Sequence, residues 1–511
     1  MKDLQETYLF LLEDPLRFAQ AASGISLRAY QAEVVLAILN SVRRGLGLSF
    51  VVMFPRQSGK NELQAQLEAY LLLLLSQTDA EMVKVSPTWK PQAQNAMRRL
   101  ERTLSTNLLT RDLWKKESGY IYRVGQARIF FFSGNPEANI VGATASTLLE
   151  VDEAQDVLPE KFDKDIAPMA AATNATRVFF GTAWTSDTLL ARELRAARKA
   201  EAVDAMQRAF VLTAEDVGKV LPSYRAFVDD QVARLGRSHP MVRTQFFSEE
   251  IEAGGGLFPP ERLSLMKGEH PPLDRPLEGA SYAFLIDVGG EDAAGEQLLA
   301  GDGLQNPSRD LTALTILSVG LSGLKDPLQR KPSYLVVHRR QWQGRSHHQL
   351  YGQMMTLIER WQPQQVVVDA TGVGAGLASF LSAALPGRVT PFVFTTSSKS
   401  KLGWDFLGVI ETGRFKDFCP DAADEEALRL QNLFMRQAAA CEHMVRNGPA
   451  HHLAWGVPDG RREADGEDWM HDDLLISAAM CAVLDDLPWS TPLPGVILQA
   501  ADPLDELDCG F

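Results

Sequence analysis

Residues 48–62 read LSFVVMFPRQSGKNE, a stretch that predicts both a fold class and a phosphate-binding loop. The run from Leu48 to Phe54 is almost continuously apolar, as in a strand that is buried on both faces of a parallel sheet. A short loop with Gly59-Lys60 follows, and a helical pattern runs from Glu62 to Ser76. Backbone amides at the start of such a helix bind phosphate, and the lysine reaches the terminal phosphates. The stretch therefore predicts a nucleotide site in an α/β domain.

The loop departs from the usual pattern GxxxxGK[ST] at two positions. Phe54 stands where the first glycine is expected, and Asn61 replaces the serine or threonine. Asn61 offers only a neutral carbonyl oxygen to Mg²⁺, which makes it a weak candidate for that role. A Gly-Lys pair in a loop does not by itself establish an ATP site.

A second stretch, TLLEVDEAQ at residues 147–155, strengthens this interpretation. It reads as a strand that ends in two adjacent carboxylates. We expect Asp152 to hold Mg²⁺ and Glu153 to polarise the attacking water. The alternative is a solvated acidic turn after a strand. Together with Lys60, the pair predicts an ATPase.

Two shorter elements fit the same site. Gln31, which follows Tyr30 before the first strand, is expected to read the adenine edge, with a surface glutamine as the alternative. Gly181-Thr182-Ala183 follows another apolar run and is expected to sense the γ-phosphate, although it could equally be a plain turn between a strand and a loop.

The second half of the chain places carboxylates at the ends of several predicted elements. Asp287 and Asp369 each end a buried-type strand, and Asp472-Asp473 open a helix. Ionised carboxylates are costly to bury unless they are paired or bind metal. Three such ends can converge to hold two Mg²⁺ or Mn²⁺ ions, which together cleave phosphodiesters. Each acid could alternatively be a turn residue, or a helix N-cap in the case of Asp472.

Composition sets broad limits. The 511 residues are 45% hydrophobic and 23% charged, which suits about two to four folded domains and excludes wholesale disorder. The net charge of −14 argues against a protein that binds nucleic acid with its whole surface, but it allows a local basic groove. No apolar run reaches the ~18–20 residues of a membrane span. We expect a cytoplasmic protein whose widely spaced cysteines are reduced: Cys419, Cys441, Cys481 and Cys509.

These motifs resemble the large terminase subunit of tailed bacteriophages. The Arg-Gln-x-Gly-Lys loop, the strand ending Asp-Glu-Ala-Gln and the Gly-Thr-Ala element occur in the order found in the ATPase of that family. The acidic ends in the order strand, strand, helix resemble its ribonuclease-H-like nuclease domain. The segment from His239 to Phe258 resembles the part that joins motor to nuclease. The resemblance covers about Leu27 to Leu487.

The resemblance implies a P-loop-type ATPase domain at residues 1–256, with a helical linker subdomain near 213–256 and a linker at 257–279. A ribonuclease-H-like nuclease domain at 280–488 and a flexible tail at 489–511 would follow. Asp310 is a candidate supporting acid, and the acidic insert at 290–308 is expected to be a flexible loop. By the same resemblance, Gly181-Thr182-Ala183 would be a coupling element that links hydrolysis to movement. The implied ATP-binding residues, with Arg56 on phosphate, are Gln31, Arg56, Gln57, Ser58, Gly59, Lys60 and Asn61.

The implied activity is ATP-driven translocation of double-stranded DNA into a procapsid, with metal-dependent endonucleolytic cutting of concatemeric DNA. Its cofactors would be Mg²⁺ with ATP, and two Mg²⁺ or Mn²⁺ ions at the nuclease site. Expected partners are the portal protein, a small terminase subunit and other copies in a ring of five, with monomers in solution. The protein would work in the cytoplasm of the infected bacterium and transiently on the procapsid.

Two other functions remain open at this stage. One is a helicase-nuclease of repair or restriction type, and the other is an inactive, prophage-derived docking protein. Basic clusters are candidates for phosphate contacts, with solvated helix faces as the alternative: Arg98, Arg99 and Arg102; Arg192, Arg195, Arg198 and Lys199; Arg339, Arg340 and Arg345.

Overall fold

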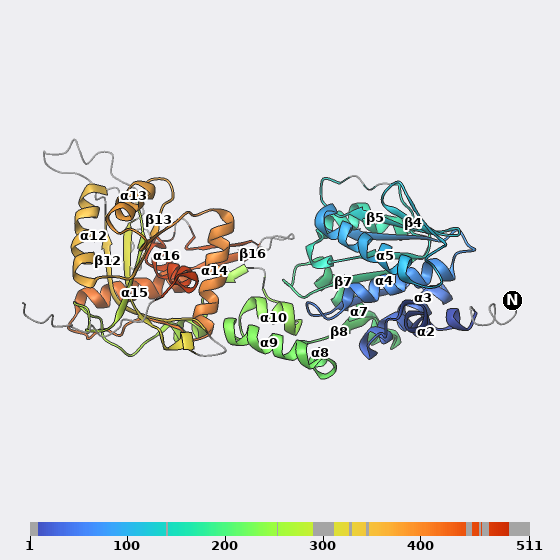
Figure 1. Cartoon of the computed structure of the whole chain (residues 1–511), viewed down its shortest axis with the longest axis horizontal. Helices are drawn as coiled ribbons and strands as arrows, with labels where there is room; N and C mark the ends of the chain where they lie inside the picture. Colours follow the sequence, from blue (N-terminus) through green and yellow to red (C-terminus); the bar gives the residue numbers. More distant parts are fainter. Residues whose placement is uncertain are drawn as a thin grey trace, which may run out of the picture. The chain divides into compact units, whose positions relative to one another are not determined.

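The computed structural model in Figure 1 describes residues 9–138, 140, 142–252, 254–289, 311–325, 330–343, 347–445, 452–458, 461 and 470–489. Asp310, the insert at 290–308 and nearly all of the predicted tail lie outside these residues. The chain divides into two compact units. The first comprises Met1–Gly255 and His443–Trp455, and the second comprises Gly256–Glu442 and Gly456–Phe511.

The first unit is built on a mostly parallel sheet. Its strands lie in the order β3-β4-β5-β2-β6-β7-β1-β8, in which only the β3-β4 and β4-β5 pairs are antiparallel. This arrangement confirms the predicted fold class. The strands are β1 Ser49–Met53, β2 Glu81–Ser86, β3 Trp114–Glu117, β4 Ile121–Val124, β5 Ala127–Ser133, β6 Leu148–Val151, β7 Thr176–Gly181 and β8 Ala209–Val211.

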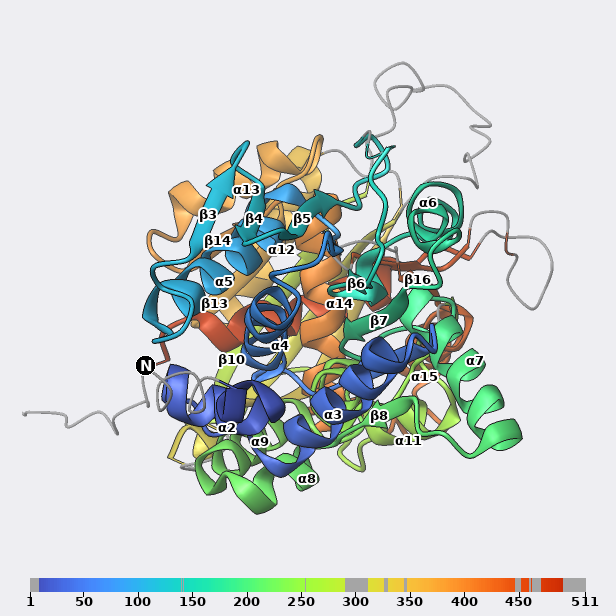
Figure 2. The same ribbon diagram turned by 90° about the vertical axis from the view of Figure 1, so that its right-hand side faces the viewer.

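Helices cover both faces of this sheet (Figures 1 and 2). Phe50 and Val52 of β1 belong to the core shared with α3 (Ala29–Arg44), α4 (Lys60–Leu74) and α5 (Gln94–Thr106). Val51 and Met53 belong to the opposite core, shared with α7 (Leu189–Asp204). Because successive side chains of a strand point to opposite faces, β1 must be apolar throughout.

Shorter helices complete the first unit. Helices α8 (Ala214–Val220), α9 (Pro222–Leu235) and α10 (Pro240–Phe247) lie in the region predicted to be a helical linker, and they pack on the α3–α5 core. The remaining helical segments are α2 Pro15–Arg17, η1 Phe18–Ala22, η2 Trp89–Ala93, η3 Ala154–Asp156, α6 Pro159–Lys161, η4 Phe162–Ile166 and η5 Ala167–Ala170.

The triple glycine at the end of the predicted ATPase domain is a short strand, β9 (Gly254–Gly256). It belongs to a small sheet of order β17-β16-β9, with β16 at Glu442–Val445 and β17 at Leu453–Gly456. Nδ1 of His443 lies 2.8 Å from the carbonyl oxygen of Gly255. Glycine is a poor strand former, so this pairing could not be predicted from the residues alone.

The second unit has a mixed sheet of order β14-β13-β10-β11-β12-β15. Strands β10, β11 and β12 are antiparallel neighbours, whereas β13 is parallel to β10 and to β14. The strands are β10 Ser281–Asp287, β11 Thr312–Gly320, β12 Ser333–Trp342, β13 Gln365–Asp369, β14 Val389–Phe392 and β15 Phe415–Lys416.

Two neighbouring residues of β12 show that helices lie on both faces of this sheet. The ring of His338 contacts Trp361 at the end of α12, while the guanidinium of Arg339 lies 4.1 Å from the ring centre of Phe434 in α15. Adjacent strand residues face opposite sides. The helical segments are α11 Pro260–Met266, η6 Ser322–Lys325, α12 His347–Trp361, α13 Gly374–Ala384, α14 Thr396–Glu411, α15 Glu425–Ala440, α16 Asp473–Ala479 and η7 Met480–Asp486.

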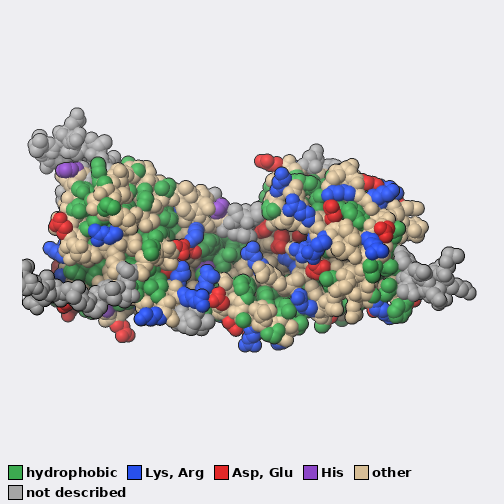
Figure 3. Space-filling view, viewed as in Figure 1, with side chains coloured by type: hydrophobic (Ala, Val, Ile, Leu, Met, Phe, Trp, Pro, Cys, Tyr) green, Lys and Arg blue, Asp and Glu red, His purple; other side chains and the backbone are tan. Residues whose placement is uncertain are grey.

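Among the described residues, no helix has both the length and the apolar character that crossing a membrane requires. Figure 3 shows Lys and Arg side chains interspersed with acidic and apolar ones on the visible face.

A buried ion pair lies within the second unit. Arg339 and Asp417 are joined by a 2.6 Å bond between Nη1 and Oδ1, and both side chains have an exposed fraction of 0%. Arg339 is therefore not available as the DNA contact that its basic cluster suggested.

We expect Asp417→Ala to lower the free energy of unfolding of the second unit by about 3–5 kcal/mol, because it leaves the Arg339 guanidinium buried without its counter-charge. Urea denaturation followed by circular dichroism would measure this loss. Asp163→Ala, which breaks the exposed pair with Arg192, should cost no more than about 1 kcal/mol. Equal losses in the two variants would contradict this account.

Candidate active sites

The predicted phosphate loop joins β1 to α4, and its shape depends on Gly59. This residue has φ +93°, a region that favours glycine, and a Cβ there would lie 2.7 Å from side-chain nitrogens of Arg28 and Gln31. Helix α4 begins at the next residue, Lys60. The backbone amides of the loop and the first turn are thus at a helix N-terminus, where anions bind.

Side chains of α3 support this loop from beneath. Gln31 donates from Nε2 to the carbonyl oxygen of Gly59 at 2.9 Å, and its Oε1 accepts from the backbone amide of Arg28 at 2.8 Å. The hydroxyl of Tyr30 donates to the carbonyl oxygen of Ser58 at 2.8 Å. Both ends of the Gln31 amide are thus engaged with backbone, which shows a supporting role; its contact with adenine stays a prediction.

Phe54, the apolar residue at the first glycine position, packs edge-on against Tyr30 with ring centres 5.6 Å apart. It is only 1% exposed. This position therefore belongs to the core beneath the loop, which explains why the chain can depart from the usual pattern here.

Lys60 faces Glu153 across the site. Its Nζ lies 3.0 Å from Oε1 of Glu153, and the lysine is 7% exposed. Glu153 directly follows Asp152 after β6 and has φ +46°, a conformation that is uncommon for residues other than glycine. Such strain in a residue of a cleft suggests a functional constraint.

A cavity of about 440 Å³ opens at this point. It brings together seven of the predicted nucleotide-site residues. Arg99 of α5 also lines it, although the sequence had indicated only that Arg99 belongs to a basic cluster. Arg99 is linked to Glu62 of the first turn of α4 at 3.7 Å. The predicted residues that line the cavity are Arg56, Gln57, Gly59, Lys60, Asn61, Glu153 and Thr182.

Gln155 connects the acidic pair to the predicted coupling element, a role that the sequence analysis missed. Its Nε2 donates to Oε2 of Glu153 at 2.9 Å, and its Oε1 accepts from the backbone amide of Thr182 at 3.1 Å. A Cβ on Gly181 would lie 2.4 Å from that same Oε1. The glycine thus allows the strand end of β7 to approach the amide.

A further acid borders the pair. Burial and the neighbouring Glu153 carboxylate raise the pKa of Asp156 to about 7. Gln155 also donates to Oδ2 of Asp156, at 3.3 Å.

In the second unit, the topology brings two of the predicted acids to one edge of the sheet. Strands β10 and β13 are parallel neighbours in which Ile286 pairs with Val368, so Asp287 and Asp369 follow at adjacent strand ends. Asp369 is 7% exposed, and its Oδ1 accepts from the amide of Thr371 at 2.8 Å. Burial raises the pKa of Asp369 above its ordinary value.

Helix α16 brings the third acidic end to the same strands. Ser477 donates from Oγ to the carbonyl oxygen of Leu285 in β10 at 2.9 Å, about one turn after the helix begins. At the start of the helix, Oδ2 of the buried Asp473 accepts from the amide of Leu311 at 3.3 Å. Asp472 occupies the N-cap position but makes no side-chain capping bond. Its Oδ2 lies 3.9 Å from Nζ of Lys399, which the sequence analysis had not singled out.

Within the described residues, no group of three or more His, Cys, Asp or Glu side chains is arranged to hold a metal ion. The assignment of Asp287, Asp369, Asp472 and Asp473 as metal ligands therefore stays a prediction.

The basic cluster on α7 is partly neutralised, because Arg192 forms two hydrogen bonds with Asp163, at 2.7 and 2.8 Å.

We expect Gln155→Leu to lower kcat for ATP hydrolysis about 10–100-fold while KM changes little, because Glu153 loses the group that orients it whereas the phosphate loop is intact. Gly181→Ala should have a similar effect. Steady-state kinetics would measure both, with Gln231→Leu of α9 as the matched control. An unchanged kcat in Gln155→Leu would contradict this interpretation.

Comparison with known proteins bears on the second unit directly. Residues 323–437, which include Asp369, match the family model described as terminase RNaseH-like domain. No curated protein matches this sequence.

Large terminases are also among the solved structures that match this chain. The large terminase of the thermophilic bacteriophage D6E is 12% identical with a TM-score of 0.45, over 88% of this chain and 98% of that one. The large terminase of bacteriophage HK97 is 12% identical with a TM-score of 0.41, over 92% and 99%. The large terminase nuclease of the thermophilic phage G20c with bound magnesium is 15% identical with a TM-score of 0.30, over 45% and 96%.

The match to the family model confirms, over residues 323–437, the ribonuclease-H-like domain that was expected in the second half of the chain, and it shows that this part is similar to terminases.

Proposed function

We propose that this protein is a phage large terminase that couples ATP hydrolysis to the translocation of double-stranded DNA into a procapsid and cuts concatemeric DNA. The observation that carries the motor assignment is the chain of contacts Lys60–Glu153–Gln155–Thr182. It joins the three sequence elements that were predicted separately from their motifs. A solvated acidic turn would require none of these contacts.

The residues of the first site fit Mg²⁺ and ATP. Lys60 is a nearly buried ammonium in an open cavity, so it can exchange its bond with Glu153 for a terminal phosphate. Glu153 would then be released to orient the attacking water, and Asp152 would hold the metal ion. The metal ion neutralises charge on the phosphates.

The residues of the second site fit divalent metal ions through their chemistry, since every predicted ligand is a carboxylate. Asp287 and Asp369 end adjacent parallel strands, and Asp473 begins the helix anchored to β10. Oxygen ligands of this kind suit Mg²⁺ or Mn²⁺. Two such ions would stabilise the attacking and leaving oxygens of a phosphodiester.

The assembly belongs to the same proposal: double-stranded DNA as substrate, with the portal protein, a small terminase subunit and a ring of copies as partners. The D6E large terminase has been solved with ADP and with ATP-gamma-S, and the G20c nuclease with magnesium and with cobalt. These ligands match the classes proposed for this chain.

We expect Lys60→Ala to reduce ATP turnover by roughly a hundredfold or more, because a charge that stabilises the transferring phosphate is removed. Phosphate release by the full-length protein, with and without double-stranded DNA, would measure it. Lys219→Ala, at an exposed lysine of α8, should leave turnover unchanged. Normal turnover in Lys60→Ala would exclude this loop as the ATP site.

We expect the native protein to cut supercoiled plasmid in Mg²⁺ or Mn²⁺, and Asp369→Asn to abolish cutting. The asparagine keeps an oxygen for the Thr371 amide but lacks the charge that a metal ion needs. Gel electrophoresis of the plasmid would show it, with Asp421→Asn as the control. If the two variants cut equally, Asp369 takes no part in the reaction.

A further inference from the structure

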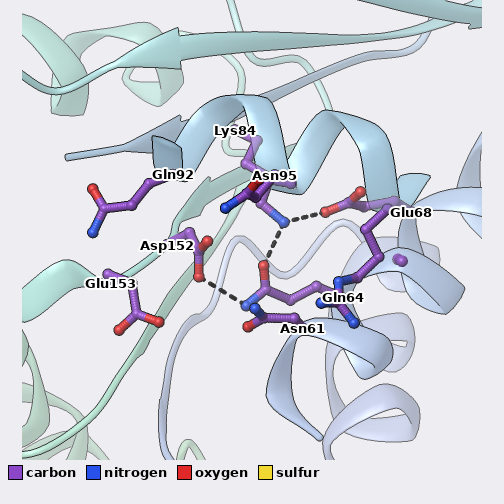
Figure 4. A pocket seen from close by; sticks show the side chains of 11 residues that line it. Asn61, Gln64, Glu68, Lys84, Gln92, Asn95, Asp152 and Glu153 are labelled. Atoms are coloured by element: carbon purple, nitrogen blue, oxygen red, sulfur yellow. Dashed lines mark hydrogen bonds and ion pairs between the residues drawn. The ribbon is translucent and has the colours of Figure 1, made fainter. Parts of the chain in front are cut away.

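A cluster of buried charges lies beside the phosphate loop (Figure 4). Lys84 of β2 places its Nζ 2.5 Å from Oε1 of Glu68 in α4 and 3.5 Å from Oε2 of Glu150 in β6. Their side chains are only 1–3% exposed. Lys84 and Glu150 are register partners on adjacent parallel strands. Burying ions in this way is costly, which calls for a reason beyond packing.

Gln64 connects this cluster to the predicted magnesium ligand. It lies one helical turn after Lys60 on α4 and is 1% exposed. Its Oε1 accepts a hydrogen bond from Nζ of Lys84, and its Nε2 donates to Oδ1 of Asp152 at 3.0 Å. Figure 4 shows the amide between the two groups.

The orientation of this amide follows from the chemistry of Lys84. An ammonium group has donors and no acceptor, so it can face only the oxygen end of the Gln64 amide. The NH₂ end must then face Asp152. Lys84 is held in turn by Glu68 and Glu150, at 2.5 and 3.5 Å. A lysine held between these two carboxyl groups excludes the flipped amide, because it has no acceptor for the NH₂ end.

We propose that Gln64, oriented by the buried Lys84–Glu68–Glu150 cluster, is a positioning residue that holds Asp152 ready to bind the Mg²⁺ of Mg·ATP. The bond uses Oδ1 of Asp152, so the carboxylate can still bind a cation through Oδ2. A cavity of about 100 Å³ adjoins these groups and is lined by Asn61 and Glu153 as well. The inference rests on the ATPase function proposed above.

A group that orients a metal-binding side chain affects the affinity for the metal ion more than the affinity for metal-free nucleotide. Loss of such a group typically weakens metal binding roughly 10–100-fold. The hydrogen bonds that the structure describes for the Gln64 side chain go to Lys84 and Asp152, and not to the loop residues that would hold the phosphates. Its removal should therefore raise the Mg²⁺ requirement and leave metal-free nucleotide binding as it is.

The test compares Gln64→Met with the native full-length protein. Methionine has a similar length but cannot make the two hydrogen bonds that the Gln64 amide makes with Lys84 and Asp152. Anisotropy of a fluorescent ATP analogue would be titrated with Mg²⁺ and repeated in EDTA. We expect the Mg²⁺ concentration for half-maximal enhancement of binding to rise about 10–100-fold. Affinity in EDTA should stay within about twofold.

The matched control is Gln66→Met. Gln66 lies on the same helix and is 3% exposed, but its Nε2 donates to Glu62 at 3.1 Å and not to Asp152. It should leave the Mg²⁺ dependence unchanged. Gln64→Leu is a second variant should the first fold poorly, and thermal unfolding monitors both.

An unchanged Mg²⁺ dependence in both Gln64 variants would overturn the inference, as would an equal loss of affinity with and without Mg²⁺. Failure of the proposed function has a different result, because the native protein itself would then not bind the analogue. That outcome would remove the basis of the inference as well.

Discussion

The ion pair between Lys60 and Glu153 is the interaction on which the first site depends. It joins the first residue of α4 to the second residue after β6, so it fixes the distance between the loop and the acidic pair. The pair also explains why Glu153 can keep an unfavourable backbone conformation, since strain persists only where surrounding contacts hold it. A phosphate that competes for Lys60 would remove one of those contacts.

Each acid of the pair is hydrogen-bonded to a different glutamine. Gln64 bonds both Asp152 and the buried Lys84, whereas Gln155 bonds both Glu153 and the amide of Thr182 after β7. An amide can donate and accept at once, which a carboxylate cannot. Each glutamine therefore binds one acid of the predicted site with one end of its amide and another element with the other end.

The sequence was sufficient for those features that depend on local order. A strand buried on both faces must be apolar throughout, so β1 and the loop after it could be predicted from residues 48–62. Parallel strand ends lie at one edge of a sheet, so the neighbouring positions of Asp287 and Asp369 followed from two separate motifs.

Pairings between distant residues could not be predicted in this way. Gln64 and Asp152, or Gln155 and Thr182, meet only after the sheet order is known, and neither glutamine stands out among polar side chains. Arg339 read as a surface cation because its partner, Asp417, lies far along the chain. Strand β9 could not be predicted either, since its glycines have a low strand propensity.

The first unit also contains a route by which a change at Glu153 could reach the helices that follow the sheet. Beyond Thr182, the backbone of Trp184 accepts from the amide of Ile251 at 3.0 Å, just after α10. At the phosphate loop, the amide of Arg56 donates to the carbonyl oxygen of Gln245 in α10 at 2.8 Å. The segment 245–251 is thus bonded both to the phosphate loop and to Trp184, two residues after the amide that Gln155 contacts. Because it is held at both points, a change in their separation must be taken up by this segment.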